Sequence, residues 1–316
     1  TGEGVVLLEP QSTNLCFDSN VFDDVSGGTT SNNELSPDGT TNATNIFFST
    51  GSNSGAKIRV GGSSATPSTD YTISFYAKNF SGDGTFRLRL DTDTQPTLVN
   101  ESFTATSEWA RYTHTFTTDA AASSFGASSR FRKSTTTDNN EVLFYGVQLE
   151  VGSLATSYIP TSGAIATRLA DSLTGAGDVN TFNDSEGVLY FEGSSLSNSL
   201  NTDGLIRIGS SSDAVDFRFD TTQNRVQIVV RAGGVNQTTS GRVITDTTAN
   251  NKFALKYKEN DIALWVNGVE EITVSSAITP TGLDTLSIVS FAGKLKVLAV
   301  FNEALTDSEL ECLTKI

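Results

Sequence analysis

The chain has 316 residues and a formal net charge of −15, from 21 basic and 36 acidic side chains. This length allows two ordinary domains, each large enough to bury a core. The acidic balance disfavours binding to nucleic acid or to anionic lipid. No apolar run approaches the ~20 residues that span a bilayer, so membrane insertion is not expected.

Composition indicates a globular, mostly β protein. Charged residues make up 18% of the chain, below the roughly 25% of an average soluble domain. Serine, threonine, asparagine and glycine fill the difference, which suits short strands and turns and disfavours long helices. The apolar content of 37% is too high for a disordered chain. Methionine is absent, so we expect that translation began upstream of residue 1.

The two cysteines, Cys16 and Cys312, lie at opposite ends of the chain in apolar surroundings. This setting is typical of cysteines that act as small buried hydrophobic residues. A single bridge between two domains is the alternative. Two cysteines in a chain of this length do not make a disulfide framework.

Alternating apolar and polar residues predict strands from one end of the chain to the other. Tyr71, Ile73 and Phe75 share one side of an extended segment. The same alternation recurs at 86–90, 112–116, 215–219, 226–230, 253–257 and 295–301. One apolar and one polar side are typical of antiparallel sheets packed in pairs.

Turn and cap signals agree with this pattern. Asn267-Gly268 stands between two short apolar runs and predicts a two-residue hairpin, because both positions of a type I′ turn need positive φ. Residues 82–84, Gly-Asp-Gly, separate two further strands. Near the end, Thr306 and Glu309 have the spacing of a capping box and predict a short C-terminal helix. The predicted fold is all-β, with two antiparallel β-sandwich (jelly-roll) domains in tandem and one short C-terminal helix.

The strand pattern is interrupted between about Ala155 and Asp178. We place the domain boundary there and predict a first domain at 1–172 and a second at 173–316. The interruption is more apolar than a free linker. We therefore expect its apolar residues to pack between the domains or against another chain; the alternative is that they fold back on the first domain. These residues are Tyr158, Ile159, Ala164, Ile165, Ala166 and Leu169.

Two segments of the first domain carry a family resemblance. Residues 7–15 read LLEPQSTNL, and residues 147–161 read VQLEVGSLATSYIPT. This pairing resembles a module of phage tail-fibre and head-spike proteins, which in turn is similar to the jelly-roll carbohydrate-binding modules of glycan-degrading enzymes. The resemblance covers roughly residues 5–170 and implies a glycan-binding jelly roll.

The second half carries a different resemblance. Residues 256–268 read KYKENDIALWVNG, and residues 295–310 read LKVLAVFNEALTDSEL. Together they are similar to the end of a laminin-G-like, concanavalin-A-like domain, over roughly residues 180–316. This implies a β-sandwich and leaves the function open, since lectins, enzymes and structural modules share it.

The residues argue against catalysis. His114 is the single histidine, and its place in an alternating segment favours a packed strand residue over a catalytic one. Glycosidases of the concanavalin-A-like type carry paired carboxylates on one strand. Here Glu192 stands alone, and the adjacent Glu270 and Glu271 point to opposite sides of a strand. We expect no enzyme activity and no catalytic residues.

A sugar-binding jelly roll uses a few aromatic platforms and polar side chains on an open surface. Several of the candidates also have a structural alternative: Trp109 would cap the core, Arg87 and Arg89 would form a solvated face, and Trp265 would cover the hairpin beneath it. The carbohydrate-binding candidates are Tyr76, Arg87, Arg89, Trp109, Tyr112 and Trp265.

Acidic clusters raise the question of a structural calcium ion, which sandwich modules hold with oxygen ligands. The resembling carbohydrate-binding modules commonly place an aspartate in the last strand, where this chain has Tyr145. A solvated acidic surface is therefore favoured, and no cofactor or metal is predicted. The clusters are Asp18, Asp23 and Asp24; Asp91 and Asp93; Asp138 and Glu141.

Together, the resemblance and the lack of catalytic sets predict a bacteriophage virion structural protein on the particle exterior, a tail fibre, head fibre or spike. Such a protein would bind host-surface polysaccharide or decorate the particle. Its expected partners are other virion proteins and itself, as a homo-oligomer and by preference a trimer. The alternative is a secreted glycan-active enzyme or its non-catalytic binding region.

Overall fold

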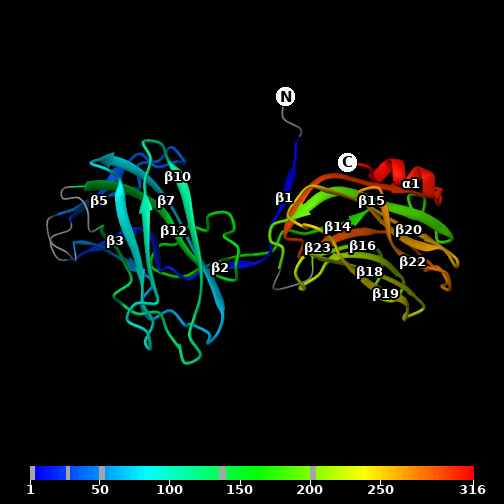
Figure 1. The fold of residues 1–316 in the computed structure, drawn as a ribbon, viewed down its shortest axis with the longest axis horizontal. Coiled ribbons are helices and arrows are strands. Elements are labelled where there is room, and N and C mark those ends of the chain that lie inside the picture. Colours follow the sequence, from blue (N-terminus) through cyan, green and yellow to red (C-terminus); the bar gives the residue numbers. More distant parts are fainter. Residues whose placement is uncertain (1–3, 26–28, 50–53, 135–139, 200–203) are drawn as a thin grey trace. The chain divides into compact units, whose positions relative to one another are not determined.

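The computed structural model describes residues 4–25, 29–49, 54–134, 140–199 and 204–316. Within these residues all strand pairings are antiparallel and the strands form β-sandwiches (Figure 1). One α-helix, α1 (Asp307–Thr314), lies in this described part, near the C-terminus. The all-β prediction is confirmed.

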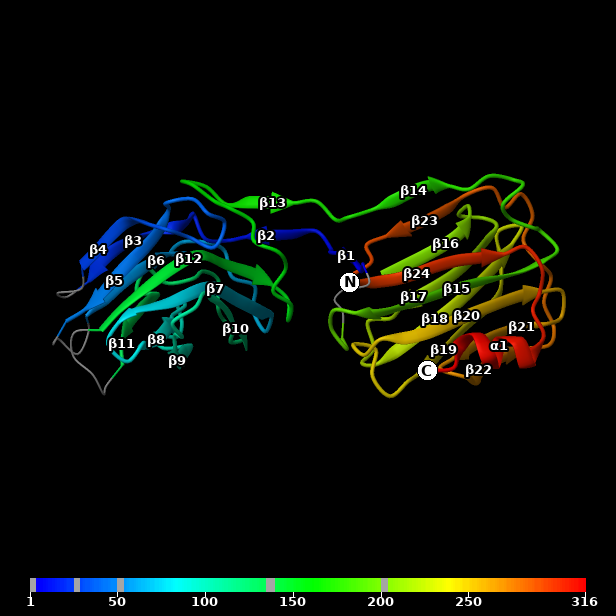
Figure 2. The ribbon, with the colours of Figure 1, turned by 90° about the horizontal axis from the view of Figure 1, so that it is seen from above.

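The first sandwich is built on phenylalanine. Phe131 and Phe144 stack with ring centroids 4.1 Å apart, and Phe75 contacts Phe131 at 4.8 Å. The figures show the two sheets as the layers of this unit (Figures 1 and 2). One sheet has the order β10 (Ala110–Thr117), β7 (Asp70–Ser81), β12 (Asn140–Val151), β5 (Ala43–Phe48), β4 (Thr29–Glu34); the other has β3 (Asp18–Val25), β6 (Gly55–Arg59), β11 (Arg130–Lys133), β8 (Thr85–Leu90), β9 (Val99–Thr104). A small pair, β2 (Ser12–Asn14) with β13 (Ala166–Arg168), lies beside them.

The second sandwich has two six-stranded sheets and a core that includes Phe191, Phe217 and Phe253. Helix α1 packs on the outside of the first of these sheets through Leu310. The first sheet has the order β1 (Val6–Leu8), β24 (Gly293–Phe301), β15 (Glu186–Ser195), β20 (Asn251–Lys258), β21 (Ile262–Val266), β22 (Val269–Val274); the second has β14 (Leu173–Ala176), β23 (Leu286–Val289), β16 (Gly204–Gly209), β17 (Ala214–Phe219), β18 (Arg225–Ala232), β19 (Val235–Val243).

The chain divides into two compact units. The first unit is Ser12–Arg168 and holds the first sandwich; the second unit combines Leu169–Ile316 with the segment before Ser12 and holds the second sandwich. This corrects the predicted first domain of 1–172, which differs from the unit at its beginning and, by four residues, at its end. Strand β1 pairs with β24, more than 280 residues later in the chain, and a pairing over that separation leaves no periodic signal in the sequence.

The predicted hairpin and helix cap are both present. Asn267 and Gly268 have φ of +52° and +84° and join β21 to β22. Thr306 caps α1 by accepting a hydrogen bond from the Glu309 backbone N–H, and the Glu309 carboxylate accepts one from the Thr306 N–H. Local sequence chemistry therefore determined these two features.

The cysteines differ from each other. Cys16 is buried, as predicted, whereas Cys312 is exposed on α1, and both are free thiols. Cys312 was expected to be buried, but its helix position faces away from the side on which Leu310 packs. Among the described residues, no helix has the length and apolar character that crossing a membrane requires.

Candidate functional site

The segments 7–15 and 147–161, which carry the first resemblance, meet at Asn14. Its side chain is fully buried and donates hydrogen bonds to the Ile159 carbonyl at 2.9 Å and the Val147 carbonyl at 3.2 Å. Its Oδ1 accepts from the N–H groups of Cys16 and Leu149. One asparagine thus joins the N-terminal segment, strand β12 and the segment that follows it.

The segment after β12 folds back over its own sheet. Gln148 accepts from the Ile159 N–H at 2.6 Å, and Glu150 accepts from the Thr156 hydroxyl at 2.5 Å and the Ser12 hydroxyl at 2.5 Å. Tyr158 and Ile159 therefore fold back on the first unit, which was the alternative to packing elsewhere. Ile165 and Leu169 remain 49% and 74% exposed.

This fold-back completes a row of aromatic rings on the outer side of the sheet β10-β7-β12-β5-β4. Tyr76 and Tyr145 are direct cross-strand partners with ring centroids 5.9 Å apart, and Tyr158 lies 5.1 Å from Tyr145. Gly146, at φ +63°, lies in the bulge of β12 between Tyr145 and Gln148. A Cβ there would meet the rings of Tyr158 and Tyr76 within 3.4 Å, so a glycine permits this packing.

Two charged groups contact the row. Arg111 lies over the Tyr76 ring, with its guanidinium carbon 5.6 Å from the centroid. The exposed Asp38 carboxylate accepts a hydrogen bond from the hydroxyl of Tyr145, the middle ring, at 2.7 Å. Hydrogen bonds from Ser36, from the Thr40 N–H and from Tyr145 hold the pKa of Asp38 well below its usual range. Asp38 is thus an ionised acceptor for hydroxyl groups.

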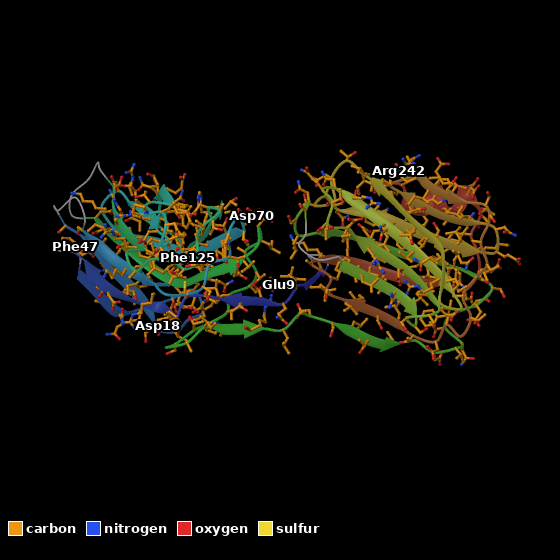
Figure 3. The ribbon with its side chains drawn as sticks, turned by 90° about the horizontal axis from the view of Figure 1, so that it is seen from below. Glu9, Asp18, Phe47, Asp70, Phe125 and Arg242 are labelled. Carbon is orange, nitrogen blue, oxygen red and sulfur yellow. The ribbon has the colours of Figure 1, made fainter. Side chains whose placement is uncertain are left out.

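The same outer side continues into an open depression lined by Ser31, Asn45, Phe47 and Glu141 (Figure 3 marks Phe47). Phe47 and Glu141 are cross-strand partners, and Phe47 is half-buried. Asn45 donates to Glu141 at 3.0 Å, while its buried Oδ1 has no partner among the described residues. We call the outer side formed by Tyr76, Tyr145, Tyr158 and this depression the aromatic face.

The aromatic face contains Tyr76, one of the six predicted sugar-binding residues. Trp109 is half-buried and directly precedes β10, two residues from Arg111. Sequence reasoning missed Arg111, Phe47 and the ring contacts of Tyr145 and Tyr158. Only the strand register brings these residues together.

Two candidates are corrected by their positions. Tyr112 points into the sandwich, where it stacks on Phe75 at 5.8 Å and donates to the Thr104 carbonyl. Trp265 is only 7% exposed and packs with Leu310 of α1. Both rings lie on the apolar side of their strands, which faces a packed layer.

Arg87 and Arg89 lie on β8, in the opposite sheet of the first unit. Their side chains point outward, since Phe86, Leu88 and Leu90 between them are fully buried. They therefore belong to a different surface from Tyr76.

The acidic clusters engage protein partners. Asp18 and Asp23 each bind Arg59 at 2.8 Å, and Asp93 accepts from the Ser123 N–H. The Asp24 side chain and Asp138 lie outside the described residues. Within the described part, no group of three histidine, cysteine or acidic residues has the arrangement of a metal site.

Two residues weighed for catalysis also have structural partners. His114 stacks on Phe116 with ring centroids 6.4 Å apart. Glu192 is buried and accepts from Asn250 at 2.7 Å and Lys296 at 3.1 Å. The Asn250 and Lys296 contacts keep the pKa of Glu192 below its ordinary value, the opposite of what a general acid needs.

No protein-family model matches the chain, and no curated protein matches it. Solved structures with partial similarity include the CBM40 of a Ruminococcus gnavus IT-sialidase bound to α2,3-sialyllactose, at 18% identity and a TM-score of 0.38, over 45% of this chain and 94% of that one. Sheep galectin-11 in complex with glycerol is similar at 8% identity and a TM-score of 0.30, over 42% and 100%. Domains LG4-5 of the mouse laminin α1 chain are similar at 11% identity and a TM-score of 0.30, over 97% and 95%. At these scores, no ligand named for a neighbour is transferred to this chain.

Proposed function

We propose that this chain is a non-catalytic recognition module on the exterior of a bacteriophage particle, and that it binds host-surface glycans through the aromatic face. The observation that carries glycan binding is the depression at Phe47. There an aromatic ring stands beside a buried, unpartnered acceptor, Asn45 Oδ1, and the Glu141 carboxylate. A sugar offers an apolar ring face and hydroxyl donors that match this set.

The phage assignment rests on the resemblance of residues 7–15 and 147–161 to fibre and spike modules. The network of Asn14, Gln148 and Glu150 supports it with a physical reason for those motifs, because their polar side chains anchor the fold-back segment that carries Tyr158. The motif thus builds part of the aromatic face.

Self-association as a trimer, alongside other virion proteins, is part of the proposal. In the second unit the edge strands β1 and β14 expose Val6 (59%), Leu7 (44%) and Leu173 (43%), and Leu169 nearby is 74% exposed. Exposed apolar edge strands need covering, and a second copy supplies the same surface. Sedimentation of the intact chain should give a trimer mass that Leu169→Asp lowers; a wild-type monomer at high concentration contradicts this assembly.

Glycan binding is tested with the intact chain on an array of bacterial surface polysaccharides. A positive glycan should bind Phe47→Ala at least tenfold more weakly. Val235→Ala, which removes a 62% exposed side chain of the second unit, is the matched control and should bind like wild type. Equal binding by Phe47→Ala and wild type would exclude this face.

The competing function, a glycan-active enzyme, is tested on the same polysaccharides. We expect no release of reducing ends and no unsaturated uronates. Either product, made by the purified chain, would replace the recognition role with catalysis.

A further inference from the structure

The outer side of the sheet β3-β6-β11-β8-β9 carries a grid of cations. In register across three strands, Lys57 of β6 pairs with Arg130 of β11, which pairs with Arg89 of β8. One step along, Arg132 of β11 pairs with Arg87 of β8. Neighbouring strands are ~4.8 Å apart and alternate residues ~7 Å apart. We call these five side chains the arginine face.

The arginine face lacks the ion pairs found elsewhere in the protein. Arg59, Arg207, Arg218, Arg225 and Arg242 all bind carboxylates. Among the described residues, by contrast, the five cations of the face form no ion pair, and Asp23, the cross-strand neighbour of Lys57, binds Arg59 instead. This difference is notable in a chain with a net charge of −15.

The guanidinium groups of this face retain free donors. Arg87 donates to the Ser102 hydroxyl at 3.1 Å, and Arg89 donates to the Pro96 carbonyl. The Nε atoms of Arg130 and Arg132 are buried and have no partner in the described structure. Buried donors are normally satisfied, so an acceptor from outside the chain fits here.

Repulsion among the five cations of the arginine face destabilises the sheet when no anion is bound. Like charges that are direct cross-strand partners destabilise a sheet. Burial and the neighbouring Arg89 and Arg132 lower the pKa of Arg130, and the Asp91 carboxylate opposes this only in part. An anion over the grid would relieve the repulsion and satisfy the donors at once.

The chemistry of the face selects the class of anion. The aromatic residues of the central strands, Phe86 and Phe131, are fully buried in the core, so the cations are not interleaved with stacking platforms for nucleobases. The arginine fork fits carboxylate and sulfate groups. An open depression that includes Phe17, Lys57, Arg59 and the Arg59-bound Asp23 adjoins the face at β6 and offers a place for a sugar ring.

We propose that the arginine face binds an acidic polysaccharide, whose carboxylate or sulfate groups repeat along the chain and bridge several arginines. This is a second site, distinct from the aromatic face, and it rests on the proposed glycan-binding function for the choice of a polysaccharide. The polymer would lie across β6, β11 and β8, with its anions over the two rows of the grid.

The test uses the intact chain and three immobilised polymers: polygalacturonate, which carries carboxylates; dextran sulfate, which carries sulfates; and dextran, the uncharged control. We expect binding to at least one acidic polymer, none to dextran, and weakening with salt. The double variant Arg130→Gln/Arg132→Gln should bind at least tenfold more weakly. Arg242→Gln, which removes an exposed, paired arginine of the second unit, should bind like wild type.

Several outcomes would overturn the proposal. These are equal binding to dextran and dextran sulfate, unchanged binding by the double variant when its thermal unfolding shows it folded, and equal affinity for duplex DNA at the same salt. A fourth is self-association that the double variant abolishes without polymer binding by wild type, since a second copy would then be the occupant. Phe47→Ala should keep polyanion binding, which separates this site from the aromatic face.

Discussion

Arg89 and Arg130 are direct cross-strand partners in the first sandwich, and no carboxylate in the described structure pairs with either one. Lys57 is the partner of Arg130 on its other side. The sheet therefore places three cations in one row, which ends at Asp23, the cross-strand partner of Lys57 that is bound to Arg59. Their repulsion has a consequence for stability.

Replacing Arg130 with glutamine should stabilise the first domain by about 0.5–1 kcal/mol at low salt, because like charges in direct cross-strand pairs are unfavourable. Urea unfolding followed by Trp109 fluorescence in a Trp265→Phe background measures this domain alone, as the chain has two tryptophans. High salt should remove the difference by screening. A loss of stability in Arg130→Gln would show that the row is neutralised within the protein.

Gly268 occupies the second turn position of the β21–β22 hairpin at φ +84°. Gly268→Val should destabilise the second domain by roughly 1–2 kcal/mol, since a β-branched residue resists the left-handed region. The cost comes from the backbone, because the nearest atom to a Cβ is 3.7 Å away. Gly268→Asn is the matched control and should cost much less. Equal unfolding midpoints for the two variants would contradict the hairpin argument.

Asp216 is completely buried and accepts from Arg207 Nε and Nη2 at 2.7 Å each and from Arg218 Nη2 at 3.1 Å. Asp216→Asn should cost the second domain about 3–5 kcal/mol, because it removes the buried carboxylate that two partly buried arginines share. Glu186→Gln, which breaks a more exposed pair with Lys258, should cost less than about 1 kcal/mol. Trp265 fluorescence in a Trp109→Phe background reports both variants. Similar losses of unfolding free energy in the two variants would mean that burial does not determine how much these ion pairs stabilise the domain.

Tyr257 should make the second domain sensitive to alkaline pH. Burial raises its pKa to about 12, whereas an unfolded tyrosine has a pKa of about 10. The folded state therefore keeps a proton that the unfolded state releases. Below about pH 10 the free energy of unfolding should be unaffected by this group. It should fall as the pH rises toward about 12, by a total on the order of 2 kcal/mol.

The variant Tyr257→Phe isolates this effect. It cannot ionise, so its free energy of unfolding should decline less over the same alkaline range, even if its stability at neutral pH is lower through loss of the hydrogen bond to the Asn183 carbonyl. Urea unfolding at a series of pH values measures both slopes. Parallel slopes for variant and wild type would assign the alkaline sensitivity to other groups.

The sequence by itself determined the features that depend on neighbouring residues. Alternation placed Phe75, Phe86 and Phe217 in buried strands, Asn267-Gly268 required positive φ, and Thr306 with Glu309 capped the helix. Each signal is local, since side-chain direction, turn geometry and capping depend on residues at most a few positions apart.

Only the tertiary structure decided which polar residues share a surface. Arg89 and Arg130 are 41 residues apart in the sequence, and their pairing follows from the order of β8 and β11 in the sheet. Tyr76 and Tyr145 likewise become neighbours through register, while the partly buried Tyr112 and the buried Trp265 pack against layers that the sequence does not reveal. Strand order and register arise from the packing of the whole sandwich, and a shift of one residue would turn every side chain to the other side.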